Sequence, residues 1–168
     1  MQCVKFNTGW IFEKTEKDSQ LRAFQGKKNT VAVTLPYDAM IRENRERDCP
    51  AGAQSGFYPG SVYAYEKTFS APEAWKTQDV FLEFEGVYGI SRVWVNGALA
   101  AVNKNGYVGF WVNLKPWIFY GEENIIRVDV DNSRQPNSRW YTGSGIYRDV
   151  NLLIGTDVYI PRDALRIT

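Results

Sequence analysis

The longest stretch without a clear strand pattern lies within residues 131–150, which read DNSRQPNSRWYTGSGIYRDV. Residues 132–144 of this stretch are polar, glycine, proline or aromatic, and they separate two segments with the pattern of strands. Connections in compact domains are usually a few residues long, and longer ones are often either functional or disordered. Trp140 and Tyr141 argue against disorder. We therefore expect a functional loop here.

The side chains of this loop have the chemistry that holds a sugar ring. Arg139 provides a rigid fork of donors, and Asn137 and Ser138 provide short donor and acceptor groups. Trp140 provides a flat apolar face. A pyranose carries hydroxyls around its rim and C–H patches on its faces, so this mixture suits it.

Two other interpretations of the loop stay open. The loop could be self-packed, with Trp140 plugging the end of the domain and Arg139 paired with Asp149 or another acid. Alternatively, the loop could have a purely structural role, in which it only stabilises contacts with another domain or subunit. The direction in which Arg139 and Trp140 point would discriminate between these interpretations.

A second aromatic loop, SGFYPGS, spans residues 55–61. Pro59 and Gly60 predict a tight turn, with Phe57 and Tyr58 at its approach. We expect Phe57 to pack at the edge of the core. Tyr58 is kept as a further candidate for sugar contact.

Two pairs of carboxylates lie two residues apart, Glu83 with Glu85 and Asp129 with Asp131. Glycosidases use two carboxylates, and residues two apart on a strand share a face with Cα atoms roughly 6.5–7 Å apart. A general acid, however, needs a pKa raised by burial. Because these side chains alternate with apolar ones, we expect them to face water and stay ionised, and no catalytic residue is assigned.

Composition excludes several other functions. The 168 residues contain no histidine, so this chain cannot build a Ser-His-Asp or Cys-His arrangement or an imidazole-based zinc site. Twenty basic residues oppose nineteen acidic ones with mixed signs, which does not indicate a nucleic-acid partner.

No membrane-spanning stretch and no leader pattern are seen, so the protein is either cytoplasmic, or secreted or periplasmic with its signal removed. Cys3 and Cys49 leave one disulfide open.

No cofactor or metal is indicated by a motif. The run Gly143–Arg148, GSGIYR, begins like a dinucleotide-binding fingerprint, but the last glycine is missing and a strand pattern follows instead of a helix. We expect these glycines to shape the end of the loop and let the chain enter a sheet. A calcium ion held by carbonyls and scattered acids is left open.

The elements that position these loops follow a period of two. In residues 80–85, Val80, Leu82 and Phe84 share one face, which predicts a half-buried strand. Asn96–Gly97 between two apolar runs predicts a hairpin with a type I′ turn. Further strands are expected at residues 31–35, 63–69, 108–114, 125–131 and 146–154, and one helical turn at 115–120. The pattern predicts an all-β, antiparallel sandwich or jelly roll.

Several pieces of the sequence together resemble the N-terminal sugar-binding domain of glycoside hydrolase family 2, the β-galactosidases, β-glucuronidases and β-mannosidases. The most specific piece is Ser138–Arg139–Trp140–Tyr141 followed by Gly143–Val150. The others are FNTGW at residue 6, LPYD at residue 35, FEGVY at residue 84, WVNG at residue 94 and GEEN at residue 121.

The resemblance implies a galactose-binding-domain-like jelly roll over residues 1–155 and an exit segment, 156–168, towards an immunoglobulin-like second domain. It also implies that the catalytic glutamates of a retaining β-glycosidase lie on a later (β/α)₈ barrel. This domain would complete the sugar pocket of that barrel with five residues: Arg139, Trp140, Asn137, Ser138 and Tyr58. Its partners would be a β-glycoside and the downstream domains, and a homo-oligomeric parent stays open. An independent carbohydrate-binding module is the alternative. In the β-galactosidases of this family, an acidic residue at the substrate and sodium site precedes the Trp of this motif. In this sequence the matching position is Ser138, so the sodium site is not carried over.

Overall fold

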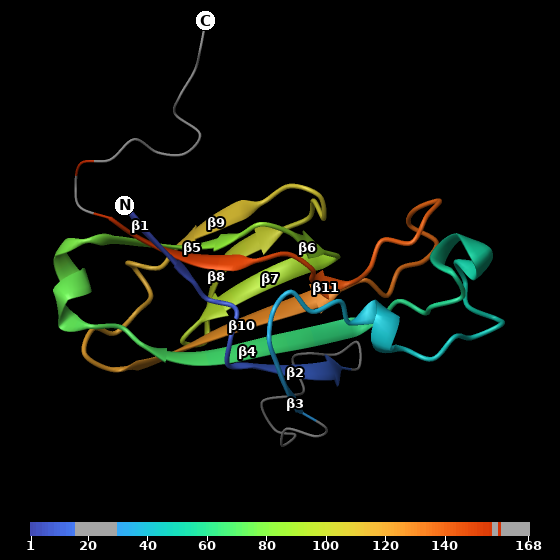
Figure 1. The fold of residues 1–168 in the computed structure, drawn as a ribbon, viewed down its shortest axis with the longest axis horizontal. Coiled ribbons are helices and arrows are strands. Elements are labelled where there is room, and N and C mark those ends of the chain that lie inside the picture. Colours follow the sequence, from blue (N-terminus) through green and yellow to red (C-terminus); the bar gives the residue numbers. More distant parts are fainter. Residues whose placement is uncertain (16–29, 156–157, 159–168) are drawn as a thin grey trace, which may run out of the picture.

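In the computed structural model, the chain forms two antiparallel sheets packed as a sandwich, which confirms the predicted fold class (Figure 1). The structure describes residues 1–15, 30–155 and 158. One sheet has the order β1-β12-β5-β9, the other has the order β3-β2-β4-β10-β7-β8, and β6 pairs with β11. The strands are β1 (Gln2–Lys5), β2 (Trp10–Thr15), β3 (Val31–Val33), β4 (Val62–Ser70), β5 (Asp79–Phe84), β6 (Val87–Tyr88), β7 (Ile90–Val95), β8 (Ala98–Asn103), β9 (Phe110–Asn113), β10 (Glu123–Asp131), β11 (Gly145–Ile146) and β12 (Val150–Gly155).

The core between the sheets follows the predicted alternation. Val80, Leu82 and Phe84 of β5 are fully buried, as are Ile126 and Val128 of β10 in the other sheet. Burying one apolar side chain of this size contributes about 1.5–3 kcal/mol to the free energy of unfolding. The contact between the apolar faces of the two sheets therefore holds the two layers together.

The Asn96–Gly97 hairpin is present between β7 and β8, and both residues have positive φ, 50° and 83°. The Asn96 side chain accepts a hydrogen bond from the Ile125 amide (2.9 Å) and donates one to the Asn124 side chain (2.8 Å). Asn124 is fully buried and accepts a hydrogen bond from the Phe119 amide at 2.7 Å. The side-chain amides of Asn96 and Asn124 therefore connect the β7–β8 turn, the segment at Phe119 and the start of β10.

Some elements differ from the sequence-based expectation. Strands β1, β2 and β6 were not predicted, and the single strand expected over residues 146–154 is divided into β11 and β12. The turn expected at residues 115–120 is closed by hydrogen bonds from Trp117 (2.9 Å) and Ile118 (3.1 Å) to the Leu114 carbonyl.

Helical structure is limited to short 3₁₀ segments, η2 (Met40–Arg42), η3 (Gly52–Ser55) and η4 (Glu73–Thr77), within the described part of the chain. None of the helices formed by these residues has the length and apolar character needed to cross a bilayer.

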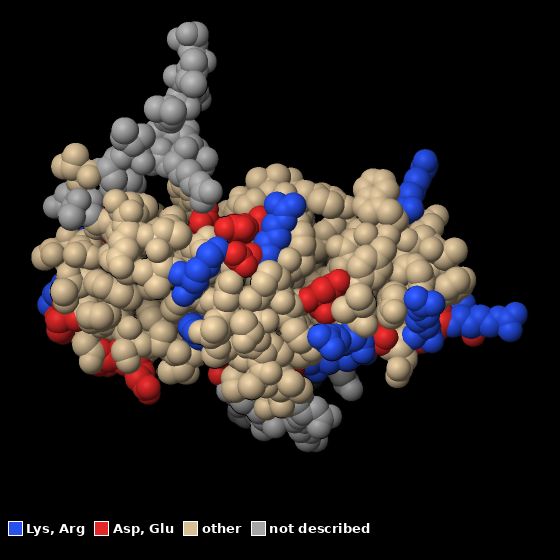
Figure 2. Space-filling view, viewed as in Figure 1, with Lys and Arg blue, Asp and Glu red and all other residues tan. Residues whose placement is uncertain are grey.

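Basic and acidic side chains are interspersed on the face shown in Figure 2. Cys3 is exposed, Cys49 is buried, and the two are not bridged.

The first strand is tied to the segment before β12 by a small polar cluster. Asp149 accepts hydrogen bonds from Lys5 and from the Asn7 side chain (3.0 Å), while the Asn7 oxygen accepts one from the Val150 amide at 2.8 Å. The hydrogen bond from Lys5, followed by that from Asn7, holds the pKa of Asp149 below its ordinary value.

This pKa shift gives a pH dependence with a definite sign. A carboxyl group whose pKa is lower in the folded than in the unfolded state stabilises the fold above its ordinary pKa of about 4, and that contribution is lost as the pH falls through the folded value. We expect an NMR titration to give Asp149 a pKa below the ordinary one, and Lys5→Ala to move it upward. Lys76→Ala, on η4, should leave it unchanged. An Asp149 pKa that ignores Lys5→Ala would contradict this account.

Candidate functional site

Two loops meet at one end of the sandwich, residues 37–61 and residues 132–144 (Figure 1). Asp38 joins them: one carboxylate oxygen accepts a hydrogen bond from the Tyr141 hydroxyl (2.6 Å), and the other accepts from the amides of Ser144 (2.9 Å) and Met40 (3.0 Å). Backbone bonds run alongside, because the Tyr37 amide donates to the Ile146 carbonyl and the Ala39 amide donates to the Ser144 carbonyl, both at 2.9 Å. The two loops are thus one connected unit.

Tyr58 lies at this junction and not in the core. Its ring meets that of Tyr141 edge-on, with centroids 5.9 Å apart, and the Arg45 guanidinium lies 5.2 Å from the Tyr58 centroid. Burial, and then the hydrogen bond to Asp38, raises the pKa of Tyr141, so its hydroxyl remains a proton donor at neutral pH. Tyr58 therefore supports the loop through Tyr141.

The expectation for Phe57 was wrong. Phe57 is 40% exposed and has a positive φ of 66°, as does Gly56 before it. The tight turn is at Gly56–Phe57, three residues earlier than the predicted turn at Pro59–Gly60, and this turn directs the Phe57 ring outward.

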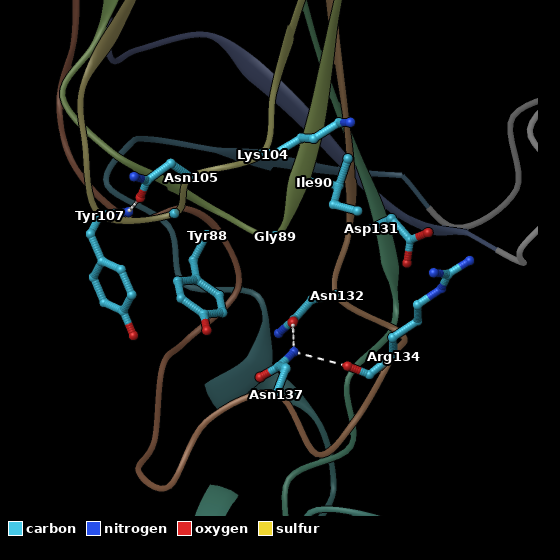
Figure 3. Close-up of a pocket in the computed structure, with 11 residues that line it drawn as sticks. Tyr88, Gly89, Ile90, Lys104, Asn105, Tyr107, Asp131, Asn132, Arg134 and Asn137 are labelled. Carbon is cyan, nitrogen blue, oxygen red and sulfur yellow. Dashed lines mark hydrogen bonds between the residues drawn. The ribbon is translucent and has the colours of Figure 1, made fainter.

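The base of the 132–144 loop is held internally. Asn132 is buried; its side-chain nitrogen donates to the Ser144 hydroxyl and to the Gly143 carbonyl (3.3 Å), and its oxygen accepts from Asn137 (2.6 Å). The Asn137 side chain also donates to the Arg134 carbonyl at 3.0 Å (Figure 3). These bonds fix the loop without a ligand.

The tip of the same loop is accessible. Trp140 is 59% exposed, and its indole N–H donates to the Tyr107 hydroxyl at 3.1 Å. The Ser138 hydroxyl donates to the Trp140 carbonyl at 2.5 Å. Trp140 does not plug the sandwich, which contradicts the self-packed interpretation. Arg139 is exposed too, and Asp149 is engaged by Lys5 instead.

A cavity of about 490 Å³ opens beside this loop. Three segments line it: the β6–β7 turn, the connection from β8 to β9 and the first half of the 132–144 loop (Figure 3). Its lining residues are Tyr88, Gly89, Ile90, Lys104, Asn105, Gly106, Tyr107, Asp131, Asn132, Arg134 and Asn137.

The structure places the five predicted site residues differently around this cavity. Asn137 lines it, and Trp140 reaches it through Tyr107. Ser138 and Arg139 lie on the loop tip outside the lining, and Tyr58 lies at the junction with Tyr141.

Sequence reasoning missed most of the residues that line the cavity. Tyr88 lay in the recognised FEGVY piece, and Lys104 precedes the Asn105–Gly106 turn, but neither signal pointed to a cavity. Arg134 was visible only as a member of the 132–144 loop, and Tyr107 carried no local signal.

The expectation that the paired carboxylates face water was wrong for two of them. Glu83 is only 4% exposed: it accepts hydrogen bonds from the Trp111 indole (3.2 Å) and from Asn151 (2.9 Å), which also donates to Glu85 (3.0 Å). Asp129 is 8% exposed and pairs with Arg127 at 2.8 Å. These acids are bound within the sheets and lie away from the loops. No group of three or more Cys, Asp or Glu that could hold a metal ion occurs among the described residues.

Comparison with known proteins identifies the family. The family model described as "Glycosyl hydrolases family 2, sugar binding domain" matches residues 28–155. The chain is 37% identical over 145 residues to a β-galactosidase of Bacteroides ovatus, covering 86% of this chain and 17% of that protein. It is 32% identical to a β-glucuronidase of Bacteroides fragilis, covering 95% of this chain and 21% of that protein.

A solved structure gives the same result. A β-glycosidase from Bacteroides vulgatus superposes with a TM-score of 0.81 at 36% identity, over 92% of this chain and 20% of that one. The chain belongs to the N-terminal sugar-binding domains of glycoside hydrolase family 2. It spans about a fifth of the length of the relatives it matches.

Proposed function

We propose that the chain is the non-catalytic first domain of a retaining β-glycosidase, and that its 132–144 loop completes the substrate pocket of a downstream (β/α)₈ barrel. The observation that carries this proposal is the pairing of an exposed tip, Arg139 and Trp140, with a base fixed by Asn132. A fixed base keeps the tip ordered before substrate arrives, which lowers the entropic cost of binding.

A non-catalytic role agrees with the placement of the acids. The buried ones, Glu83 and Asp129, are engaged by Asn151 and Arg127. Asp131 lies at the cavity, where it accepts hydrogen bonds from the Ser133 amide and hydroxyl. A glycosidase needs two carboxylates facing one scissile bond, and this end of the domain offers only one among its described lining residues.

In this proposal each predicted residue has a separate role. Arg139 reaches sugar hydroxyls or a carboxylate with its fork, and Trp140 provides the apolar face. Asn137 and Ser138 set the course of the loop through their hydrogen bonds to Asn132 and to the Trp140 carbonyl. Tyr58 buttresses the junction from the side of the 37–61 loop.

Removing the Arg139 side chain in the full-length parent enzyme tests this role. A charged hydrogen bond contributes about 1.5–3 kcal/mol, so we expect Arg139→Ala to lower kcat/KM on the best substrate by roughly 10- to 100-fold. Arg92→Ala, on the exposed face of β7, is the control and should leave the kinetics unchanged. Wild-type kinetics in Arg139→Ala would refute the assignment.

The cavity favours a second candidate, a carbohydrate-binding module that works without the barrel. Calorimetry of the 168-residue chain with galactose, glucuronate and mannose separates the two functions. Saturable binding supports the module, whereas silence fits a half-site that needs the barrel.

A further inference from the structure

The cavity beside the 132–144 loop has two chemically different walls (Figure 3). Tyr88 and Tyr107 lie side by side on one wall, and Asp131 and Arg134 lie on the opposite one. Lys104 extends along a third side. A ligand that fills the space therefore meets an aromatic wall and a charged wall at once.

The charged lining of the cavity, which is this wall together with Lys104, has a net positive charge. Lys104 and Arg134 contribute two positive charges and Asp131 one negative, which leaves one positive charge over. Asp131 uses one of its oxygens to accept from Ser133, amide at 3.0 Å and hydroxyl at 2.7 Å. Within residues 1–15, 30–155 and 158, neither Lys104 nor Arg134 forms a salt bridge with a carboxylate, so both cations are available to a ligand.

The aromatic wall is fixed in advance. Tyr107 is 53% exposed, and its ring meets Tyr88 edge-on with centroids 5.4 Å apart. A Cβ on Gly106 would lie only 2.4 Å from the Tyr88 ring, so glycine is what allows the backbone to approach this closely. The Tyr147 hydroxyl donates to the Gly106 carbonyl at 2.8 Å, and Trp140 donates to Tyr107.

We infer that this cavity binds one anionic sugar unit, with its carboxylate or sulfate ester turned to the side of Lys104 and Arg134 and its ring turned to the side of Tyr88 and Tyr107. The volume of about 490 Å³ lies within the usual range for small-ligand sites, and the amides of Asn105 and Asn137 can pair with ring hydroxyls. The inference rests on the second of the two proposed functions, that this end of the domain holds sugar without the barrel, and adds the charge of that sugar.

Two matched probes test the charge, methyl β-D-glucuronide and methyl β-D-glucoside, which differ only in the carboxylate at C6. We expect NMR titration of the ¹⁵N-labelled 168-residue chain at low salt to show tighter binding of the glucuronide by about tenfold or more. The shifted amides should surround Lys104, Tyr107 and Arg134. Because exposed charges are screened, the preference should shrink at 0.5 M NaCl. Glucose 6-sulfate, as a third probe, distinguishes a sulfate ester from a carboxylate.

Substitutions should move this preference in opposite directions. Lys104→Gln and Arg134→Gln should each reduce the glucuronide preference, and together they should abolish it. Asp131→Asn keeps an acceptor for Ser133 but removes the opposing charge, so the preference should rise. Lys76→Gln removes one positive charge at the other end of the sandwich and should change nothing.

The outcomes separate this inference from the proposed function. Equal binding of the two glycosides in the cavity would overturn the charge selection and leave sugar contact standing. Shifts confined to residues 139–141, or no binding of any probe, would overturn the cavity site, while the parent-enzyme test with Arg139→Ala would still decide the loop's role. Glucuronide binding that the double glutamine variant leaves intact would also refute the inference.

Discussion

Replacing Gly145 with alanine should lower the free energy of unfolding by about 3–4 kcal/mol, because the residue has neither the backbone conformation nor the space for a side chain. Its φ is +93°, and an added Cβ would lie 1.9 Å from the Tyr65 hydroxyl oxygen. Tyr65 cannot move aside, since it is fully buried and donates to the Tyr37 carbonyl at 3.0 Å. Urea denaturation followed by tryptophan fluorescence measures the loss.

Gly97→Ala is the matched control. Gly97 also has a positive φ, +83°, but no atom lies within 4 Å of its added Cβ. Its substitution should cost only the backbone strain, about 1–2 kcal/mol. Adding Tyr65→Phe to Gly145→Ala should recover part of the loss by removing the oxygen in the way. Equal losses in the two alanine variants would show that steric conflict at Gly145 is not the cause.

Asp38→Ala should separate the two loops that form the site. It removes the acceptor for Tyr141, Ser144 and Met40 together, so we expect a loss of about 2–3 kcal/mol in the free energy of unfolding. The Ser144 amide should exchange with solvent faster, because it loses its only side-chain acceptor among those identified. In the parent enzyme, a displaced 132–144 loop should raise KM.

Two variants calibrate this result. Tyr141→Phe removes one of the three hydrogen bonds and should cost about 1 kcal/mol. Asp48→Ala removes an exposed carboxylate from the same 37–61 loop and should change stability by less than about 0.5 kcal/mol. If Asp38→Ala matched Asp48→Ala in stability and in amide exchange, the role of Asp38 as the junction would be refuted.

The central strands could be predicted because their signals are local. The alternation in β5 and the Asn96–Gly97 turn depend on neighbouring residues only, and both are present. β1 gave no such signal, since all four of its residues are exposed. The break between β11 and β12 falls at residues 147–149, where the Tyr147 hydroxyl donates to the carbonyl of Gly106, a residue distant in the sequence.

The candidate site was only partly predictable for the same reason. The length and aromatic content of the 132–144 loop are visible in the sequence, whereas the cavity is assembled from segments around Tyr88, Tyr107 and Asn137 that meet only in the fold. Alternation also indicated which face Glu83 occupies. It could not indicate that Trp111 and Asn151 bury that face.

The pairing of β1 with β12 has a mechanical consequence. The two strands are antiparallel and Gln2 lies opposite Ile154, so these two residues are at the same end of the row of backbone hydrogen bonds that joins the strands. A force that pulls these two residues apart would load one pair of backbone bonds at a time, as in opening a zip, instead of shearing all of them together. In a force experiment with tethers at Gln2 and Ile154, β1 should therefore peel away at low force, before the sandwich and its cavity give way.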